Sequence, residues 1–340
     1  MNPLLLNKTI ETPSHSTSEV RSPSASRQDR IANVERLRIL SAFGVASFHT
    51  HVWFPRSFGI VGFVVLLLSF CAFVINRTEP YEFGDLAKRK AERLLKPWLF
   101  WSIIYGALAL TKVLYRDIPF SDVFSVTMFL TGTRIHLWFL PFAFVAAVFL
   151  VLVHQRTVKV PETRNIVAAI IIGMVCVLGC SIIQTWVHLH TPLLQWTLGL
   201  PAIPLGFAIG RIMILPEHKD RRNFYLLVAL SSAAGFVAYT ALLRLECGTW
   251  FDPGSEYIVR YGISIALVCL ALCWPGRLDP ISGILGSLSY GIYLVHPLVL
   301  VFLCQFEMLM HQPLLLLFLV LVISGTITLV FKKTPLKQFI

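Results

Sequence analysis

Long, uninterrupted apolar runs recur along this chain of 340 residues, separated by short polar stretches. Many of the runs approach the roughly 20 residues that an α-helix needs to cross a bilayer. The composition agrees with membrane insertion, because 56% of the residues are hydrophobic and only 14% are charged, whereas about 25% are charged in typical soluble domains. The runs are continuous rather than alternating, which excludes an outer-membrane β-barrel. We therefore predict an all-α, polytopic transmembrane helical bundle.

Hydropathy predicts ten membrane spans and two regions. Residues 1–32 are rich in Ser, Thr, Pro and charge, and are predicted to be a disordered cytoplasmic N-terminal tail. Residues 33–340 are predicted to form one transmembrane domain, with a short interfacial or re-entrant helix within 121–132. Pro201 and Pro204 interrupt the sixth span, as membrane helices tolerate. The predicted spans are 37–54, 58–75, 97–115, 136–153, 165–183, 193–210, 223–243, 257–274, 284–304 and 313–331.

Lys and Arg are concentrated in alternate loops. If the N-terminus faces the cytoplasm, 23 of the 29 Lys and Arg residues fall in segments on the cytoplasmic side. Cytoplasmic loops retain Lys and Arg, so we predict a multi-pass plasma (inner) membrane protein with both termini in the cytoplasm. The net charge of +11 has the same origin, and no nucleic acid partner is expected. The helically spaced pairs Cys176/Cys180 and Cys269/Cys273 have no His or acid beside them, so neither a metal nor a bound cofactor is expected.

The first span contains two histidines, and polar residues inside membrane helices are candidate functional groups. His49 follows Arg38 by eleven residues, which is within about 20° of a whole number of helical turns and about 16 Å of rise. His51 points about 140° away from Arg38. The spacing therefore selects His49 as the partner of Arg38 and assigns His51 to the outer interface. A packing or hydrogen-bonding role for His49 is the alternative.

A basic cluster precedes the third span, in the stretch KRKAERLLKPWLFW. A helical turn would present Arg89, Lys90 and Arg93 together, and Pro97 is expected to begin the following helix. Three interpretations fit these residues: a topology signal, a site for lipid head groups, or a clamp for the phosphates of a nucleotide-containing donor. The residues alone favour the topology signal.

Polar residues also occur in the fourth and ninth spans. His136 and Trp138 lie at the start of the fourth span, in the stretch RIHLWFLP. In the ninth span, Ser289, Tyr293 and His296 are spaced by four and three residues. This spacing predicts a polar stripe that faces a cavity or another helix rather than lipid. Close helix packing through nearby small residues is the alternative.

Together these motifs resemble the acyltransferase-3 family of integral membrane acyltransferases. The first-helix signature of that family is an acidic residue three positions before an Arg, then ten residues and a His; Glu35, Arg38 and His49 match it. The basic run before Pro97 is similar to the family's Arg-x-x-Arg element, with Lys90 at the first Arg position, where the bidentate fork of Arg is lost. The stretches HLWFLP, SLSYGIYLVHP and, near the C-terminus, KTPL resemble later segments of the family.

The resemblance implies transfer of an acyl group, usually acetyl, from cytoplasmic acyl-CoA to a hydroxyl of a carbohydrate or other cell-envelope molecule. His49 would act as the general base or as an acyl relay, with Arg38 assisting, and Arg89, Lys90 and Arg93 would bind acyl-CoA. An exporter of an envelope polysaccharide precursor is an alternative, although such folds often show internal symmetry; a catalytically silent relative on the same scaffold is another. The candidate cavity-lining residues are Glu35, His136, Trp138, Ser289, Tyr293 and His296.

Overall fold

All regular secondary structure in the described part of the chain is helical, as expected where a backbone in lipid must satisfy its own N–H and C=O groups. The computed structural model describes residues 31–50, 56–76, 82–116, 119–215, 218–247, 253–274 and 276–340. Residues 31–340 form one compact unit. The predicted tail lies outside the described residues as far as residue 30.

The long helices follow the predicted spans. They are α2 (Ala32–His49), α3 (Arg56–Asn76), α4 (Phe83–Arg116), α7 (Phe139–Thr157), α8 (Glu162–Trp186), α11 (His218–Cys247), α12 (Pro253–Cys273), α13 (Pro280–Leu303) and α15 (Pro313–Lys332). The sixth predicted span is divided into α9 (Leu193–Gly199) and α10 (Ala202–Met213). The connections contain α5 (Phe120–Val123), α6 (Met128–Thr131), η1 (Ile135–Trp138), α14 (Glu307–Met310) and η2 (Pro335–Phe339).

Proline positions explain one confirmed boundary and one wrong prediction. Pro201 separates α9 from α10, because proline lacks an N–H and its ring blocks the preceding turn. The prediction that Pro97 begins a helix is wrong, since α4 begins at Phe83 and continues through Pro97. The carbonyl that Pro97 leaves without its helical partner belongs to Arg93, an exposed residue. Water can satisfy this carbonyl, so the helix continues.

Eight helices in the described residues are long and apolar enough to cross a membrane, counting α9 and α10 together. Of the predicted spans, α2 and α11 are helical but are not among these eight. The first two turns of α2 carry Glu35, Arg36 and Arg38, and part of α11 lies outside the residues whose side chains are described. The helical, multi-pass architecture is thus confirmed. The count of ten spans and the direction of insertion stay predictions.

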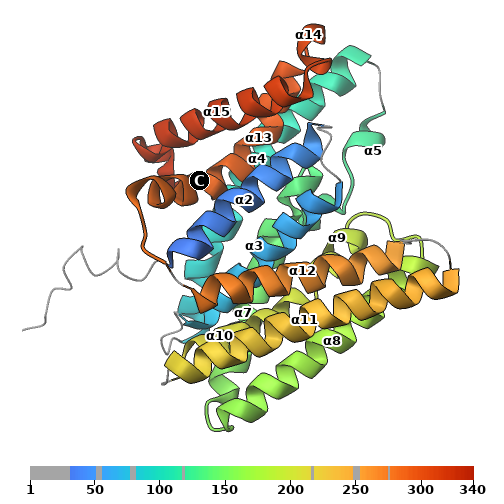
Figure 1. The fold of residues 1–340 in the computed structure, drawn as a ribbon. Coiled ribbons are helices and arrows are strands. Elements are labelled where there is room, and N and C mark those ends of the chain that lie inside the picture. The colour runs from blue at the N-terminus through green and yellow to red at the C-terminus, as the bar shows by residue number, and fades with distance from the viewer. Residues whose placement is uncertain are drawn as a thin grey trace, which may run out of the picture. The chain divides into compact units, whose positions relative to one another are not determined.

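Within residues 31–340, α3 lies at the centre of the helix packing. It contacts α2, α7, α10 and α12, and the side chains of Val64, Leu67 and Leu68 are fully buried. On one side of α3, α2 packs against α13, and α13 packs against α15; on the other side, α12 packs against α8 and α11 (Figure 1). Helix α4 packs against α7 and η2.

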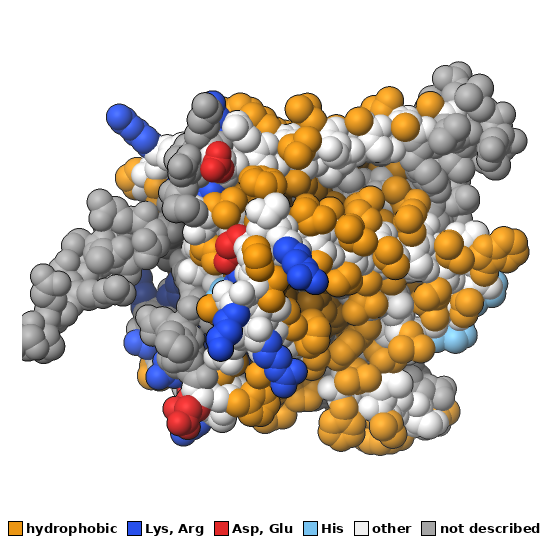
Figure 2. Space-filling view, turned by 90° about the horizontal axis from the view of Figure 1, so that it is seen from below, with side chains coloured by type: hydrophobic (Ala, Val, Ile, Leu, Met, Phe, Trp, Pro, Cys, Tyr) orange, Lys and Arg blue, Asp and Glu red, His pale blue; other side chains and the backbone are white. Residues whose placement is uncertain are grey.

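The outward-facing surface is strongly apolar. Hydrophobic side chains cover most of the face seen in Figure 2, and Lys and Arg gather toward its left half. On α8, the side chains of Ile171, Val175 and Ile182 are all more than half exposed. Soluble monomers rarely expose large contiguous apolar patches, so this surface fits contact with lipid.

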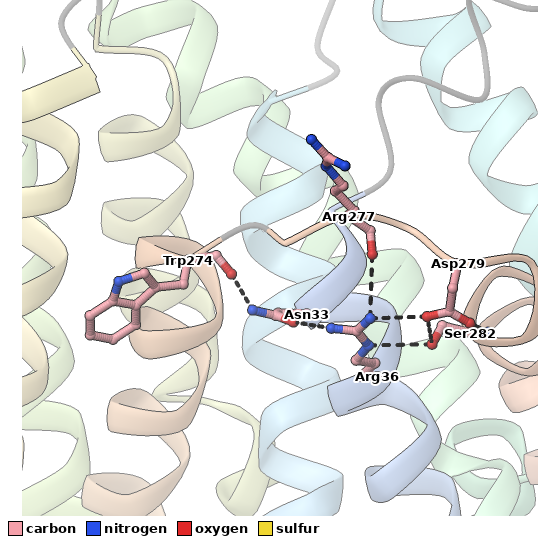
Figure 3. A network of polar contacts seen from close by, with 6 residues as sticks. All are labelled: Asn33, Arg36, Trp274, Arg277, Asp279 and Ser282. Carbon is pink, nitrogen blue, oxygen red and sulfur yellow. Dashed lines mark hydrogen bonds and ion pairs between the residues drawn. The ribbon is translucent and has the colours of Figure 1, made fainter.

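A polar network joins the start of α2 to the start of α13 (Figure 3). It consists of Asn33, Arg36, Trp274, Arg277, Asp279 and Ser282. Arg36 forms an ion pair with Asp279 at 2.9 Å and donates to the Ser282 hydroxyl at 3.3 Å. Asp279 also caps α13, accepting from the Ser282 N–H at 2.8 Å. The hydrogen bonds from the Ser282 N–H and hydroxyl, together with the one from Arg36, lower the pKa of Asp279 below its ordinary value.

Candidate active site

Three histidines from distant parts of the sequence meet where α2 ends. His49 is the last residue of α2, His136 lies in η1 and His296 lies in α13. The ring of His296 lies between the other two, with ring centroids 5.3 Å from His49 and 6.0 Å from His136. His136 and His296 are 7% and 1% exposed, whereas His49 is of intermediate exposure. We call these three residues the imidazole cluster.

Pro297 explains how the His296 ring is held. A proline has no N–H, so Pro297 cannot bond to the carbonyl of Tyr293, four residues earlier in the helix. His296 Nδ1 takes this place, at 2.9 Å from the Tyr293 carbonyl and 3.1 Å from the Ile292 carbonyl. Carbonyl oxygens only accept hydrogen bonds, so Nδ1 carries the proton and donates. The sequence Tyr-x-x-His-Pro thus fixes both the orientation and the tautomer of this imidazole.

Two buried tyrosines connect η1 and α4 to α13. The Tyr293 hydroxyl donates to the backbone carbonyl of His136, and the Tyr105 hydroxyl donates to the Leu294 carbonyl at 2.7 Å. The ring of Tyr105 also lies edge-on to that of His136, with centroids 4.9 Å apart. Because Tyr293 and His136 are joined directly, η1 and α13 hold their histidines in a fixed relation. Tyr105 was not predicted as a site residue, because it lies in an apolar run with no distinguishing motif.

Arg38 and Glu35 form an ion pair near the start of α2, away from the imidazole cluster at its end. Arg38 Nη1 donates to both carboxylate oxygens of Glu35, at 3.2 and 3.3 Å. The Glu35 side chain is 8% exposed and that of Arg38 is 34% exposed. Gly286 of α13 makes this packing possible, because a Cβ at that position would collide with the Glu35 carboxylate. Arg38 is about 16 Å from His49 along the helix, so the two residues lie at different levels of α2.

The remaining residues predicted in this region have packing contacts. The Ser289 hydroxyl donates to the Gly286 carbonyl of its own helix at 2.8 Å. Trp138 is 5% exposed, and its ring centroid is 5.1 Å from that of Phe63 and 5.5 Å from that of Phe142. Phe63 also contacts the ring of Tyr293, at 6.3 Å between centroids. Trp138 therefore packs behind Tyr293 through Phe63, whereas Ser289 bonds within its own helix. His51, predicted to point elsewhere, lies outside the described residues.

A basic hollow of about 500 Å³ lies beside α4. It is lined by Arg89, Glu92, Arg93, Lys96 and Gln338. Arg89 and Arg93 were predicted to act together with Lys90, which is not among the lining residues. Lys96 takes that place, and the spacing of four and seven residues from Arg89 puts all three cations on one helical face. We call Arg89, Arg93 and Lys96 the basic stripe.

The residues of η2 close one side of the basic hollow. Lys96 Nζ donates to Gln338 Oε1 at 2.6 Å and lies 5.5 Å from the centroid of the Phe339 ring. The Phe339 ring stacks on that of Phe100 with centroids 4.1 Å apart, and the Trp101 indole donates to the Phe339 carbonyl at 2.9 Å. Helix α4 carries both the basic stripe and Tyr105, which follows Lys96 by nine residues, about 14 Å of helix. Nine residues also turn the helix by about 180°, so the exposed stripe and the buried Tyr105 lie on opposite faces of α4.

A second buried polar group was not predicted from the sequence. Arg211 of α10 is 1% exposed; it forms a bidentate pair with Glu162 at 2.6 and 2.7 Å, and its Nη1 lies 2.7 Å from His154 Nδ1. A guanidinium only donates, so His154 Nδ1 accepts. These bonds join α7, α8 and α10, which makes the group a structural anchor. The signal available in the sequence was a lone Arg inside an apolar run.

The described residues contain no group of three or more His, Cys, Asp or Glu arranged to hold a metal ion. The fold and the site therefore define a class: a multi-pass helical membrane protein with a buried imidazole cluster and a basic hollow. A family model described as "Acyltransferase domain" matches residues 31–332. The chain belongs to this acyltransferase-3 family, which confirms the resemblance and makes the protein a membrane acyltransferase. No curated protein and no solved structure matched the chain.

Proposed function

We propose that this protein is a plasma-membrane O-acyltransferase that moves an acyl group, in the first instance acetyl, from cytoplasmic acyl-CoA to a hydroxyl of a carbohydrate or other cell-envelope acceptor. The observation that carries the proposal is the meeting of His49 with two buried imidazoles in a chain of an acyltransferase family. Hydroxyl acylation needs a group that accepts a proton or carries the acyl group near neutral pH, and imidazole does both.

The donor would bind along α4. Its nucleotide end carries several phosphates, and the basic stripe offers three cations on one helical face. A long flexible arm separates the phosphates of acyl-CoA from its thioester. The cluster lies about 14 Å further along α4, and nine residues also turn the helix by about 180°, so the arm would pass around α4 to bring the thioester to the cluster while the phosphates stay at the stripe. Lys90 is half-buried beside the stripe and would add charge without lining the hollow.

The orientation required for a cytoplasmic donor agrees with the distribution of Lys and Arg, of which 23 of 29 would face the cytoplasm. Arg38 lies about 16 Å from His49 along α2, about as far from the cluster as the basic stripe lies along α4. Its charge would attract a donor phosphate or offset negative charge that develops on the thioester oxygen. Glu35 would act indirectly, by holding the Arg38 guanidinium at the α2–α13 contact.

The test is release of free thiol from acetyl-CoA by membrane vesicles that contain the protein, because the vesicles supply hydroxyl acceptors. Vesicles with the wild-type protein should release thiol above the rate of vesicles without it, and His49→Ala should reduce that rate at least about 100-fold. His311→Ala is the matched control, because His311 is an exposed histidine outside the imidazole cluster. Thiol release that persists in His49→Ala, or that never occurs with the wild type, would overturn the proposal; the second result would favour the exporter alternative.

A further inference from the structure

The His296 ring contains a buried nitrogen, Nε2, that is not bonded within the described part of the chain. Its Nε2 atom and that of His136 have no hydrogen-bond partner among the described residues, although both side chains are at least nine-tenths buried. A buried polar atom without a partner costs about 1–3 kcal/mol. Such an atom persists where a bound molecule satisfies it during function.

The chemical character of this nitrogen follows from the helix. His296 Nδ1 donates its proton to the carbonyls of Tyr293 and Ile292, so in the neutral imidazole Nε2 carries a lone pair and no proton. Nε2 of His296 is therefore a hydrogen-bond acceptor. A buried hydrogen-bond acceptor can bind a hydroxyl group, which is the group that an O-acyltransferase must deprotonate.

Two of the three rings in the imidazole cluster, those of His49 and His296, differ in their exposure. His49 is partly exposed and lies at the end of α2, on the helix that also carries Arg38. His296 lies behind it, with the ring centroids 5.3 Å apart, and is 1% exposed. The more accessible ring can meet the thioester of an incoming donor. The ring behind it is positioned to meet the hydroxyl that approaches the same acyl carbon.

We propose that His296 is the proton acceptor for the hydroxyl of the acyl acceptor, and that His49 carries the acyl group; this assignment rests on the proposed function. A His49 nitrogen attacks the thioester carbonyl carbon, the C–S bond breaks, and CoA leaves as the thiolate. The hydroxyl oxygen then attacks the acyl carbon of acyl-His49, and the C–N bond breaks with its electron pair returning to His49. The hydroxyl proton passes to His296 Nε2, and the resulting imidazolium protonates the thiolate. Charge and atoms balance, and both histidines end neutral.

The test compares two acyl acceptors. Membrane vesicles that contain the protein receive acetyl-labelled acetyl-CoA, and acetyl ester formed on endogenous hydroxyl groups is measured. A parallel reaction contains hydroxylamine, a nucleophile that attacks without prior loss of a proton, and acetyl hydroxamate is measured. His296→Asn keeps an N–H at the position of Nδ1, so it preserves the hydrogen bond to Tyr293, but it has no atom at the position of Nε2.

His296→Asn should lower ester formation at least about 100-fold and hydroxamate formation less than about threefold. His49→Ala should lower both products equally, because the acyl group then has no carrier. His311→Asn is the control for the substitution itself. If His296→Asn accumulates poorly, His296→Leu with Pro297→Ala replaces it, since the backbone N–H that the second substitution restores can then bond to the Tyr293 carbonyl.

Ester formation at the wild-type rate in His296→Asn would overturn the assignment. Equal loss of ester and hydroxamate in His296→Asn, with a lowered thermal midpoint, would also overturn it, because that combination marks a structural role. Recovery of hydroxamate formation in His49→Ala would show that His49 is the base and would also overturn it. Failure of the wild type to consume acetyl-CoA would instead overturn the proposed function on which the assignment rests.

Discussion

Donor affinity should depend on Lys96 rather than on Lys90. Replacing both Arg93 and Lys96 by Ala removes two of the three cations that line the basic hollow, whereas Lys90 lies outside it. Buried charge-assisted contacts contribute about 1.5–3 kcal/mol each, but exposed pairs contribute about 0.2–1 kcal/mol. Both side chains are exposed, so about 1 kcal/mol each is the appropriate figure. The double variant should therefore bind acetyl-CoA about 30-fold more weakly.

The assay is the KM for acetyl-CoA in thiol release, together with competitive inhibition by CoA. Lys90→Ala should change either constant less than about threefold, and so should Lys88→Ala, which removes the same charge from an exposed position on the same helix. The effect of the double variant should shrink as ionic strength rises, because exposed charges are screened over about 10 Å at 0.1 M salt.

One further variant separates charge from structure. Lys96 also holds Gln338 of η2, so Lys96→Ala could act by displacing that segment. Gln338→Ala breaks the same contact and leaves the charge in place, and it should leave donor affinity near the wild-type value. Equal weakening by Gln338→Ala, or weakening by Lys90→Ala without weakening by the double variant, would refute the reasoning.

Further predictions concern the helical face, the α2–α13 network and topology. His49→Ala should lower transfer at least about 100-fold while His51→Ala keeps most activity in membranes normalised to protein amount; equal loss in both would contradict the face argument. Arg38→Lys should recover little of the activity lost in Arg38→Ala if the bidentate fork matters. Asp279→Ala should lower the thermal midpoint at pH 7, and the deficit should shrink as pH falls below about 4, because a lowered pKa stabilises the fold only while the carboxylate is charged; a deficit that is independent of pH would exclude this origin. A reporter active only in the periplasm should be inactive when fused after Ile340, and strong activity would reverse the proposed orientation.

The sequence was sufficient to predict where the long helices lie, because apolar length is a local property, although the helix start predicted at Pro97 is wrong. It was also sufficient to single out His49 and His296, since each is a polar residue in an apolar helix. The meeting of these residues was not predictable, because they lie 247 positions apart in the chain and spacing along one helix says nothing about its neighbours. The family signature identified His49 with Arg38, but it placed no second imidazole beside it.

The cations that line the basic hollow are a different set from the pair that the Arg-x-x-Arg motif selects. The Arg-x-x-Arg element directs attention to Lys90 and Arg93, which are three residues apart. Because α4 begins at Phe83, Arg89, Arg93 and Lys96 belong to one helix, whereas the expected helix start at Pro97 had left Lys96 outside it. Helical periodicity applied from Arg89 as far as Pro97 would have found Lys96. Gln338, by contrast, reaches the hollow only through tertiary packing of η2.

The polar network at the start of α2 and α13 fixes the two helices relative to each other, and so sets the relative depth of His49 and His296 toward their other ends. Both helices run in the same direction from that network, since contacts join Arg36 to Ser282 at one level and His49 to His296 at another. On α2, His49 follows Arg36 by thirteen residues, about 20 Å of rise. On α13, His296 follows Ser282 by fourteen residues, about 21 Å of rise. Equal lengths bring the two rings to the same depth. One residue inserted in either helix would shift its ring by about 1.5 Å and turn it by about 100°, so chain length within these two segments is as constrained as the identity of the histidines.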